Sequence, residues 1–219
     1  MQPLTQMKLL TYSQIDNIFQ IFAHENPTPK TELKYNNHFQ LLIAVVMSAQ
    51  ATDISVNKAT DTLFQFIQTP EDILILGEEK LKQYIKSIGL YHAKAKNIIK
   101  LSEMLVNQLN SIVPDNYEAL IKLPGVGHKT AKVILNCLFN VPIIAVDTHI
   151  FRVAQRLGIA YAPTAEKLEH ELLKAIPSQY HHHAHHWLIL HGRYICKAQK
   201  PKCTECKLAH LCVFYKVNN

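Results

Sequence analysis

Apolar residues recur at the spacing of an α-helix along most of the chain, and this pattern restricts the possible folds more than any other feature. Side chains three and four positions apart share one face of a helix, so each run predicts an amphipathic helix. Glycine, which weakens helices, occurs only 6 times among 219 residues. We therefore predict an all-α fold, with buried faces at Ile15-Ile18-Phe19-Phe22, Phe39-Leu42-Ile43-Val46, Leu63-Phe66-Ile67, Ile98-Leu101-Leu105 and Leu168-Leu172-Leu173.

Polar residues and prolines mark the expected ends of these helices. Asp53, Asp115, Asp147 and Thr164 can each cap the N-terminus of a helix, because their side chains accept hydrogen bonds from first-turn N–H groups. The apolar segment 141–146 could pass for a buried strand. It contains Pro142 and is isolated between helices, so a buried linker is the preferred interpretation.

The chain is basic, and its excess positive charge gathers near the C-terminus. Lys and Arg number 23 against 17 Asp and Glu, which gives a formal net charge of +6. Between Trp187 and Lys216 six basic residues face one acidic residue, Glu205. This distribution predicts a local basic patch suited to a polyanion. The longest apolar stretch, 41–47, is far too short for a membrane span, so we expect a cytoplasmic protein.

One low-complexity tract, 181–186, contains five histidines. Histidines can bind a transition metal, but adjacent residues on one helix point in different directions. A polar helix start leading into Trp187 is therefore the preferred interpretation.

The segment 114–139 reads PDNYEALIKLPGVGHKTAKVILNCLF and predicts two helices joined by a Pro-Gly-Val-Gly turn. In such a helix-hairpin-helix, Gly125 and Gly127 allow a close backbone approach, so the unpaired N–H groups opening the second helix can face a DNA phosphate. An ordinary αα-corner, in which the glycines only cap a helix, explains the turn equally well.

Two residues near this hairpin could carry chemistry. Lys129 falls in the first turn of the second helix, where the helix dipole disfavours a cation and partial burial would disfavour it further, as an amine nucleophile requires. From charge pattern alone, phosphate binding is the favoured interpretation of Lys129, as for its neighbours Lys122 and Lys132. Asp147 is expected at an N-cap, where a fixed carboxylate could also stabilise positive charge developing on a sugar.

Four cysteines, Cys196, Cys203, Cys206 and Cys212, follow the spacing C-x6-C-x2-C-x5-C. In a reducing compartment such crowding favours metal ligation over disulfides, and both zinc and an iron–sulfur cluster are compatible with four thiolates. The metal would close the loop 197–202, whose lysines, Lys200 and Lys202 among them, are expected to contact DNA. Cys137 lies on an apolar helix face and is interpreted as a buried thiol.

Several longer stretches together resemble the endonuclease III family of the helix-hairpin-helix glycosylase superfamily. They are SAQATD at 48–53, IKSIGLYHAKAKNI at 85–98, LPGVGHKTA at 123–131, AVDTHIFRV at 145–153 and HHWLILHGRYIC at 185–196, with the cysteine spacing. The resemblance covers essentially the whole chain. It implies a [4Fe-4S] cluster on the four cysteines and two helical domains flanking a DNA-binding cleft. These are a six-helix domain over 31–141, with the hairpin at about 115–138, and a cluster domain formed by 1–30 and 142–219.

The resemblance also implies an activity: a monomeric base-excision-repair enzyme that acts on double-stranded DNA with a damaged pyrimidine or an abasic site. As a DNA glycosylase it would remove oxidised pyrimidines, and as a lyase it would cut the strand at the abasic site. Lys129 would attack C1′ and form a Schiff base, Asp147 would assist, and β-elimination would cut the strand. The active site would lie where the two domains meet, and the protein would associate with the nucleoid.

In this family Gln50 fills the gap left by the flipped base, and Leu90 wedges into the base stack next to Ile88. Extruding a base costs a few kcal/mol, which inserted side chains can offset. Without the family, Leu90 could be a helix-cap contact and Gln50 an ordinary helix-end residue.

The sequence departs from the family at two positions: His128 stands where Arg is common, and Lys132 where Asn is frequent. Both could alter phosphate contacts or the pocket wall. Two alternative functions remain at this point. One is a monofunctional adenine-mismatch-type glycosylase, which Lys129 argues against. The other is a non-catalytic iron–sulfur DNA-binding module, which predicts that Lys129→Ala leaves function intact.

Overall fold

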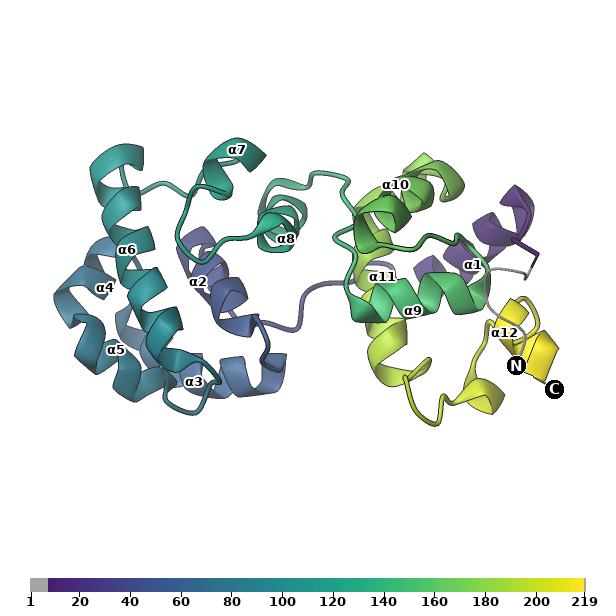
Figure 1. The fold of residues 1–219 in the computed structure, drawn as a ribbon, viewed down its shortest axis with the longest axis horizontal. Helices are drawn as coiled ribbons and strands as arrows, with labels where there is room; N and C mark the ends of the chain where they lie inside the picture. The colour runs from purple at the N-terminus through teal and green to yellow at the C-terminus, as the bar shows by residue number, and fades with distance from the viewer. Residues whose placement is uncertain (1–7, 219) are drawn as a thin grey trace. The chain divides into compact units, whose positions relative to one another are not determined.

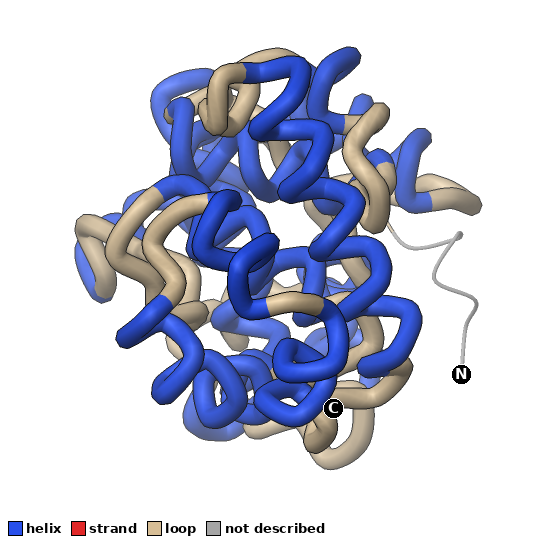
Figure 2. The backbone as a smooth tube through the Cα atoms, turned by 90° about the vertical axis from the view of Figure 1, so that its left-hand side faces the viewer, coloured by secondary structure: helices blue, strands red, loops and turns tan. Residues whose placement is uncertain are grey.

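The computed structural model describes residues 8–218, and these form helices and loops without a strand (Figures 1 and 2). The predicted all-α fold is confirmed, and segment 141–146 is a linker whose residues Ile144, Ala145 and Val146 are buried. Within the described residues no helix is both long and apolar enough to cross a membrane. The helices are α1 (Tyr12–Glu25), α2 (His38–Ser48), α3 (Asp53–Phe66), α4 (Pro70–Leu76), α5 (Glu78–Ile85), α6 (Tyr91–Leu109), α7 (Tyr117–Leu120), α8 (His128–Phe139), α9 (Thr148–Leu157), α10 (Ala165–Ala175), α11 (His181–Tyr194) and α12 (Val213–Asn218), with 3-10 turns η2 (Ser178–Tyr180) and η3 (Cys203–Glu205).

Two of the four expected helix caps are correct, and two are one residue out of place. Asp147 caps α9 and Thr164 caps α10, each accepting a bond from the first turn. The predictions for Asp53 and Asp115 were wrong, because Thr52 caps α3 and Asn116 caps α7. In both cases two polar residues stand side by side, and the one in the extended conformation becomes the cap.

The chain divides into two compact units, which are described separately. Unit 1 comprises Met1–Lys30 and Asn140–Asn219, as far as these are described, and unit 2 comprises Thr31–Phe139. Unit 2 contains the seven helices α2 to α8, one more than the expected six, and Gly77 separates the short helices α4 and α5.

In unit 2 the apolar helix α2 lies at the centre, buried along nearly its whole length, with every residue from Phe39 to Met47 buried. Helices α3, α6 and α8 pack around it. A helix that is apolar on all sides requires such cover. Phe66 is an exception to the predicted pattern, since it ends α3 with 63% of its surface exposed.

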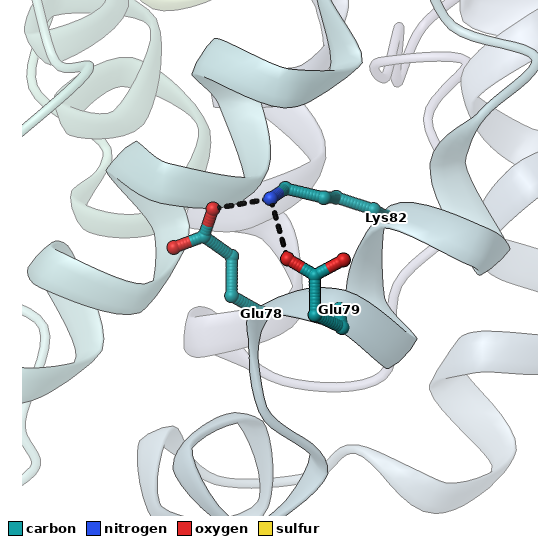
Figure 3. A network of polar contacts seen from close by, with 3 residues as sticks. All are labelled: Glu78, Glu79 and Lys82. Atoms are coloured by element: carbon teal, nitrogen blue, oxygen red, sulfur yellow. Dashed lines mark hydrogen bonds and ion pairs between the residues drawn. The ribbon is translucent and has the colours of Figure 1, made fainter.

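Helix α5 carries a surface ion-pair network at its start (Figure 3). Lys82 Nζ lies 2.7 Å from Glu78 Oε1 and 2.8 Å from Glu79 Oε1, and both acids occupy the first turn, where the helix dipole favours negative charge. Exposed pairs of this kind contribute little stability. Helix α5 leads directly into the loop that carries Ile88 and Leu90.

The core of unit 1 is built around aromatic side chains of α1 and α11. Trp187 lies against Phe19 and Phe22, with ring centroids 6.1 and 6.3 Å apart, and its Nε1 donates to the carbonyl of Asn26 at 2.8 Å. Helix α11 begins at His181, at the predicted polar start before Trp187. Its Gly192 packs tightly on α9, because a Cβ there would lie 2.9 Å from Cβ of His149.

Candidate active site and DNA-binding elements

The hairpin of unit 2 forms as expected, with a short first helix, α7, of four residues. Gly125 has φ +83°, and a Cβ there would lie 3.1 Å from both Asn97 Cβ and Val46 Cγ1. This glycine is therefore required by the fold itself. Gly127 differs, since its φ is not in the left-handed region and a Cβ would meet nothing within 4 Å. Gly127 is exposed and directly precedes the first residue of α8.

Lys129 is the second residue of α8, in the first turn as predicted. Its side chain is exposed, so the partial burial expected from the sequence is not found. The opposite face of α8 carries the buried Ala131, Ile134 and Leu135, which leaves Lys129 outside the core of unit 2.

Asp147 lies in unit 1, where it caps α9 by accepting a 2.8 Å bond from the N–H of Ile150 at its Oδ1. The linker before it is buried and α9 follows directly, so both ends of this short segment are fixed. The carboxylate is half-buried and bound to a backbone donor. Lys129 and Asp147 thus belong to different units.

Gln50 and Leu90 lie on adjacent loops of unit 2. Both adopt positive φ, at 56° and 61°, which is uncommon and costly for residues other than glycine. A Cβ on Gly89 would lie 4.0 Å from the carbonyl of Gln50, so the loops approach closely. Gln50 is exposed and Leu90 is 62% exposed, whereas Ile88 is 1% exposed. The Ile88 side chain therefore packs in the interior and offers no surface to DNA.

The four C-terminal cysteines line one pocket of unit 1, together with Leu157, His191, Phe214 and Tyr215 among others. Burial raises the pKa of Cys206, and it raises that of Cys212 to about 11. Thiols in such surroundings become thiolates only when a cation binds them.

The four cysteines share one pocket, so their thiolates could hold a metal group together. Four thiolates are compatible with a zinc ion and with an iron–sulfur cluster.

Two arginines of α9, not predicted as site residues, anchor the segment that leads to the cluster pocket. Arg152 donates to the carbonyls of Cys196 at 2.9 Å and Gly192 at 2.8 Å. Arg156 donates to the carbonyls of Lys197 at 2.7 Å and Ala198 at 3.1 Å, and lies 3.7 Å from the sulfur of Cys196. Their i, i+4 spacing places both on one face of α9, which was the only signal in the sequence.

The loop 197–202 is therefore held by the protein chain as well as by its closing cysteines. The carbonyl of Ile195 accepts from the N–H groups of Lys197 and Lys202, at 2.9 and 3.0 Å. Lys200 and Lys202 are exposed, and Lys202 lies 3.2 Å from Glu205.

Cys137 of α8 was expected to be a thiol, and its surroundings favour that form. Burial raises the pKa of this side chain to about 12.

Comparison with known proteins defines the class to which this fold and site belong. Residues 43–178 match the HhH-GPD superfamily of base excision DNA repair proteins, and residues 196–212 match the iron–sulfur binding domain of endonuclease III. The first match includes the hairpin, Lys129 and Asp147, and the second spans the four cysteines. The class is therefore a helical DNA-repair glycosylase with an iron–sulfur cluster.

Relatives identify the family within this class. The chain is 60% identical over 201 residues to endonuclease III of Rickettsia conorii, covering 92% of this chain and 96% of the relative. It is 53% identical over 189 residues to endonuclease III of Escherichia coli, covering 86% and 90%. A non-covalent endonuclease III–DNA complex matches with a TM-score of 0.88 at 46% identity, covering 96% of this chain and 99% of the other. A trapped endonuclease III–DNA covalent intermediate matches with a TM-score of 0.87 and the same identity and coverage.

The chain belongs to the endonuclease III family. It is a DNA-binding enzyme of base excision repair, a glycosylase with abasic-site lyase activity that holds an iron–sulfur cluster. This membership decides against both alternatives, the monofunctional glycosylase and the non-catalytic module.

Proposed function

We propose that the protein releases damaged pyrimidines from duplex DNA through Lys129 and Asp147 and then cuts the strand at the abasic site. It acts as a monomer on nucleoid DNA in the cytoplasm. The observation that carries the proposal is the position of Lys129, exposed in the first turn of α8 next to the open approach at Gly127. An amine there can reach the sugar of a nucleotide whose phosphate rests on the hairpin.

The neutral amine of Lys129 forms a bond to C1′, the bond from C1′ to the base breaks, and the base departs with that electron pair and takes up a proton. The nitrogen loses one proton, the C1′–O4′ bond breaks as O4′ gains a proton, and the nitrogen is left with C1′ as a protonated Schiff base. Loss of a C2′ proton breaks the C3′–O bond, so the strand is cut on the 3′ side. A base that takes up the first proton of the lysine assists this attack.

Asp147 supplies that base and a fixed negative charge. Its Oδ1 accepts from the N–H of Ile150, which holds the carboxylate in place, and a carboxylate can take up a proton or stabilise the charged sugar. Because the carboxylate is held by the helix cap, little reorganisation accompanies the reaction.

Gln50 and Leu90 open the site in the duplex. Both are exposed on adjacent loops with left-handed backbones, so the fold presents them at a conformational cost. Leu90 offers an apolar wedge for the base stack, and Gln50 a polar group for the orphan base. The buried Ile88 side chain anchors the loop of Leu90 in the core of unit 2.

The four cysteines hold the [4Fe-4S] cluster, which supplies a cross-link that closes the loop 197–202. Arg156 orders the backbone of the same loop, so that Lys200 and Lys202 meet the DNA backbone with less loss of freedom.

The test separates base release from strand cleavage in single-turnover reactions on a duplex with one oxidised pyrimidine. Alkali treatment reveals all base release, and untreated samples reveal enzymatic cleavage. Lys129→Ala should lower cleavage by at least ~100-fold while DNA affinity changes only a few-fold. Lys122→Ala, which removes an exposed lysine from the same hairpin, is the matched control and should keep cleavage at saturating protein. Cleavage by Lys129→Ala at a near-native rate would refute the proposal.

A further inference from the structure

The two helices of the hairpin are joined at their starts by a tyrosine–histidine pair. Tyr117 opens α7 and His128 opens α8. The hydroxyl of Tyr117 is hydrogen-bonded to Nδ1 of His128, and the rings stack with centroids 5.9 Å apart and planes at 22°. Tyr117 is half-buried and His128 is exposed, so the pair holds one face of the imidazole and leaves the other to solvent.

The chemistry of the two groups decides which of them donates. A phenol is a good hydrogen-bond donor, whereas the bare nitrogen of a neutral imidazole is a strong acceptor. The favoured arrangement is therefore O–H of Tyr117 donating to Nδ1 of His128. A neutral imidazole carries one ring proton, and this bond places it on Nε2.

We propose that Tyr117 is a positioning residue for the hairpin's contact with DNA: it fixes His128 in the form that carries its proton on Nε2, and from there the neutral imidazole donates to a phosphate oxygen. His128 begins α8, beside the open approach at Gly127. Its Nε2–H adds a side-chain donor to the backbone N–H groups of the helix start.

The consequence is a phosphate contact without a charge. A contact made by Lys or Arg releases a counterion and steepens the salt dependence of binding, whereas a neutral donor does not. The inference deepens the proposed function and rests on it, because the hairpin must bind DNA for the pair to matter.

The experiment measures affinity for a duplex with a non-cleavable abasic-site analogue at pH 8, where an ordinary histidine is neutral, over a range of salt concentrations. His128→Ala should weaken binding at least about tenfold with an unchanged slope of log K against log salt, because a hydrogen bond to a charged oxygen is lost while no counterion-releasing charge is removed. His128→Arg should steepen the slope by about 0.9. Tyr117→Phe should weaken binding about two- to fivefold at an unchanged slope. Tyr84→Phe removes a hydroxyl elsewhere in unit 2 and should change nothing.

Nitrogen-15 NMR of the histidine rings gives a readout that a purely structural role would not move. In the native protein Nδ1 of His128 should show the shift of an unprotonated acceptor and Nε2 that of a protonated donor, and Tyr117→Phe should mix the two forms.

Three results would overturn the inference: a proton on Nδ1 in the native protein, a slope lowered by about 0.9 in His128→Ala, or affinities unaffected by both substitutions. If the native protein cuts oxidised duplex and any of these is found, the inference alone fails. If the native protein does not bind the abasic duplex, the proposed function fails first.

Discussion

The two glycines of the hairpin turn should respond to alanine in opposite ways, although they are two residues apart. At Gly125 the added Cβ meets Asn97 and Val46 at 3.1 Å, and φ is +83°. A left-handed backbone costs an L-residue about 1–2 kcal/mol, and the contacts add to it. At Gly127 the added Cβ meets nothing within 4 Å, and φ lies outside the left-handed region. Alanine there should leave stability unchanged or raise it by up to about 1 kcal/mol.

Alanine at Gly127, although harmless to stability, should weaken DNA binding. If the space beside Gly127 is where a phosphate approaches the N–H groups of α8, a methyl group there blocks the approach. Losing one hydrogen bond to a charged oxygen costs about 1.5–3 kcal/mol, which corresponds to a tenfold or larger loss of affinity. Gly127→Ala should therefore unfold no earlier than the native protein and bind DNA at least about tenfold more weakly.

Thermal unfolding and fluorescence anisotropy with an abasic-analogue duplex measure the two quantities on the same samples. At about 2–4 °C per kcal/mol for a chain of this size, Gly125→Ala should lower Tm by several degrees. The reasoning is refuted if Gly127→Ala lowers Tm as much as Gly125→Ala, or if it binds DNA like the native protein.

The remaining predictions concern unit 1. Asp147→Asn keeps the helix cap and Asp147→Ala loses it, so only the alanine variant should lose about 1 kcal/mol of stability in urea unfolding. Both variants should slow strand cleavage at least ~100-fold. An Asp147→Asn variant as active as the native protein contradicts this. Arg156→Ala removes two bonds to loop carbonyls and the contact with Phe214, 4.7 Å from the ring, and should speed hydrogen exchange across 197–202. Gly192→Ala forces a Cβ to within 2.9 Å of Cβ of His149 and should cost about 1–3 kcal/mol of stability.

A pH-dependence prediction follows from His186, which is buried in α11. Burial first, and then nearby positive charges, lower its pKa from 6.5 to about 4. The folded state thus binds fewer protons than the unfolded state, so stability is full above pH 6.5 and is lost as pH falls toward 4. The loss should amount to about 3 kcal/mol and should shrink in His186→Asn. If His186→Asn loses as much stability as the native protein between pH 6.5 and pH 4, the prediction is wrong.

Much of the fold and part of the site could be predicted from local patterns. Helical spacing gave the all-α class, and a polar residue before an apolar run located the caps at Asp147 and Thr164. The same rule erred by one residue at Asp53 and Asp115, because the neighbouring Thr52 and Asn116 are equally able to cap. Adjacent candidates of similar propensity are separated only by backbone conformation.

Features that depend on distant contacts could not be predicted. Arg152 and Arg156 bind carbonyls about forty residues further along the chain, and nothing local to α9 indicates their partners. The pairing of Tyr117 with His128 requires the hairpin to close before the side chains meet. The burial of Ile88 could not be predicted either. An apolar side chain can serve as a wedge in DNA or as a core residue, and only the packing of the folded chain places this one inside.

Borohydride trapping on the native protein tests the central claim, that Lys129 forms a Schiff base with C1′, most directly. The enzyme is mixed with a duplex carrying one oxidised pyrimidine and reduced, and the cross-linked peptide is mapped by mass spectrometry. The account predicts one adduct per protein, on Lys129, which disappears in Lys129→Ala and persists in Lys122→Ala. An adduct on another lysine, or none although the duplex is bound, would contradict it.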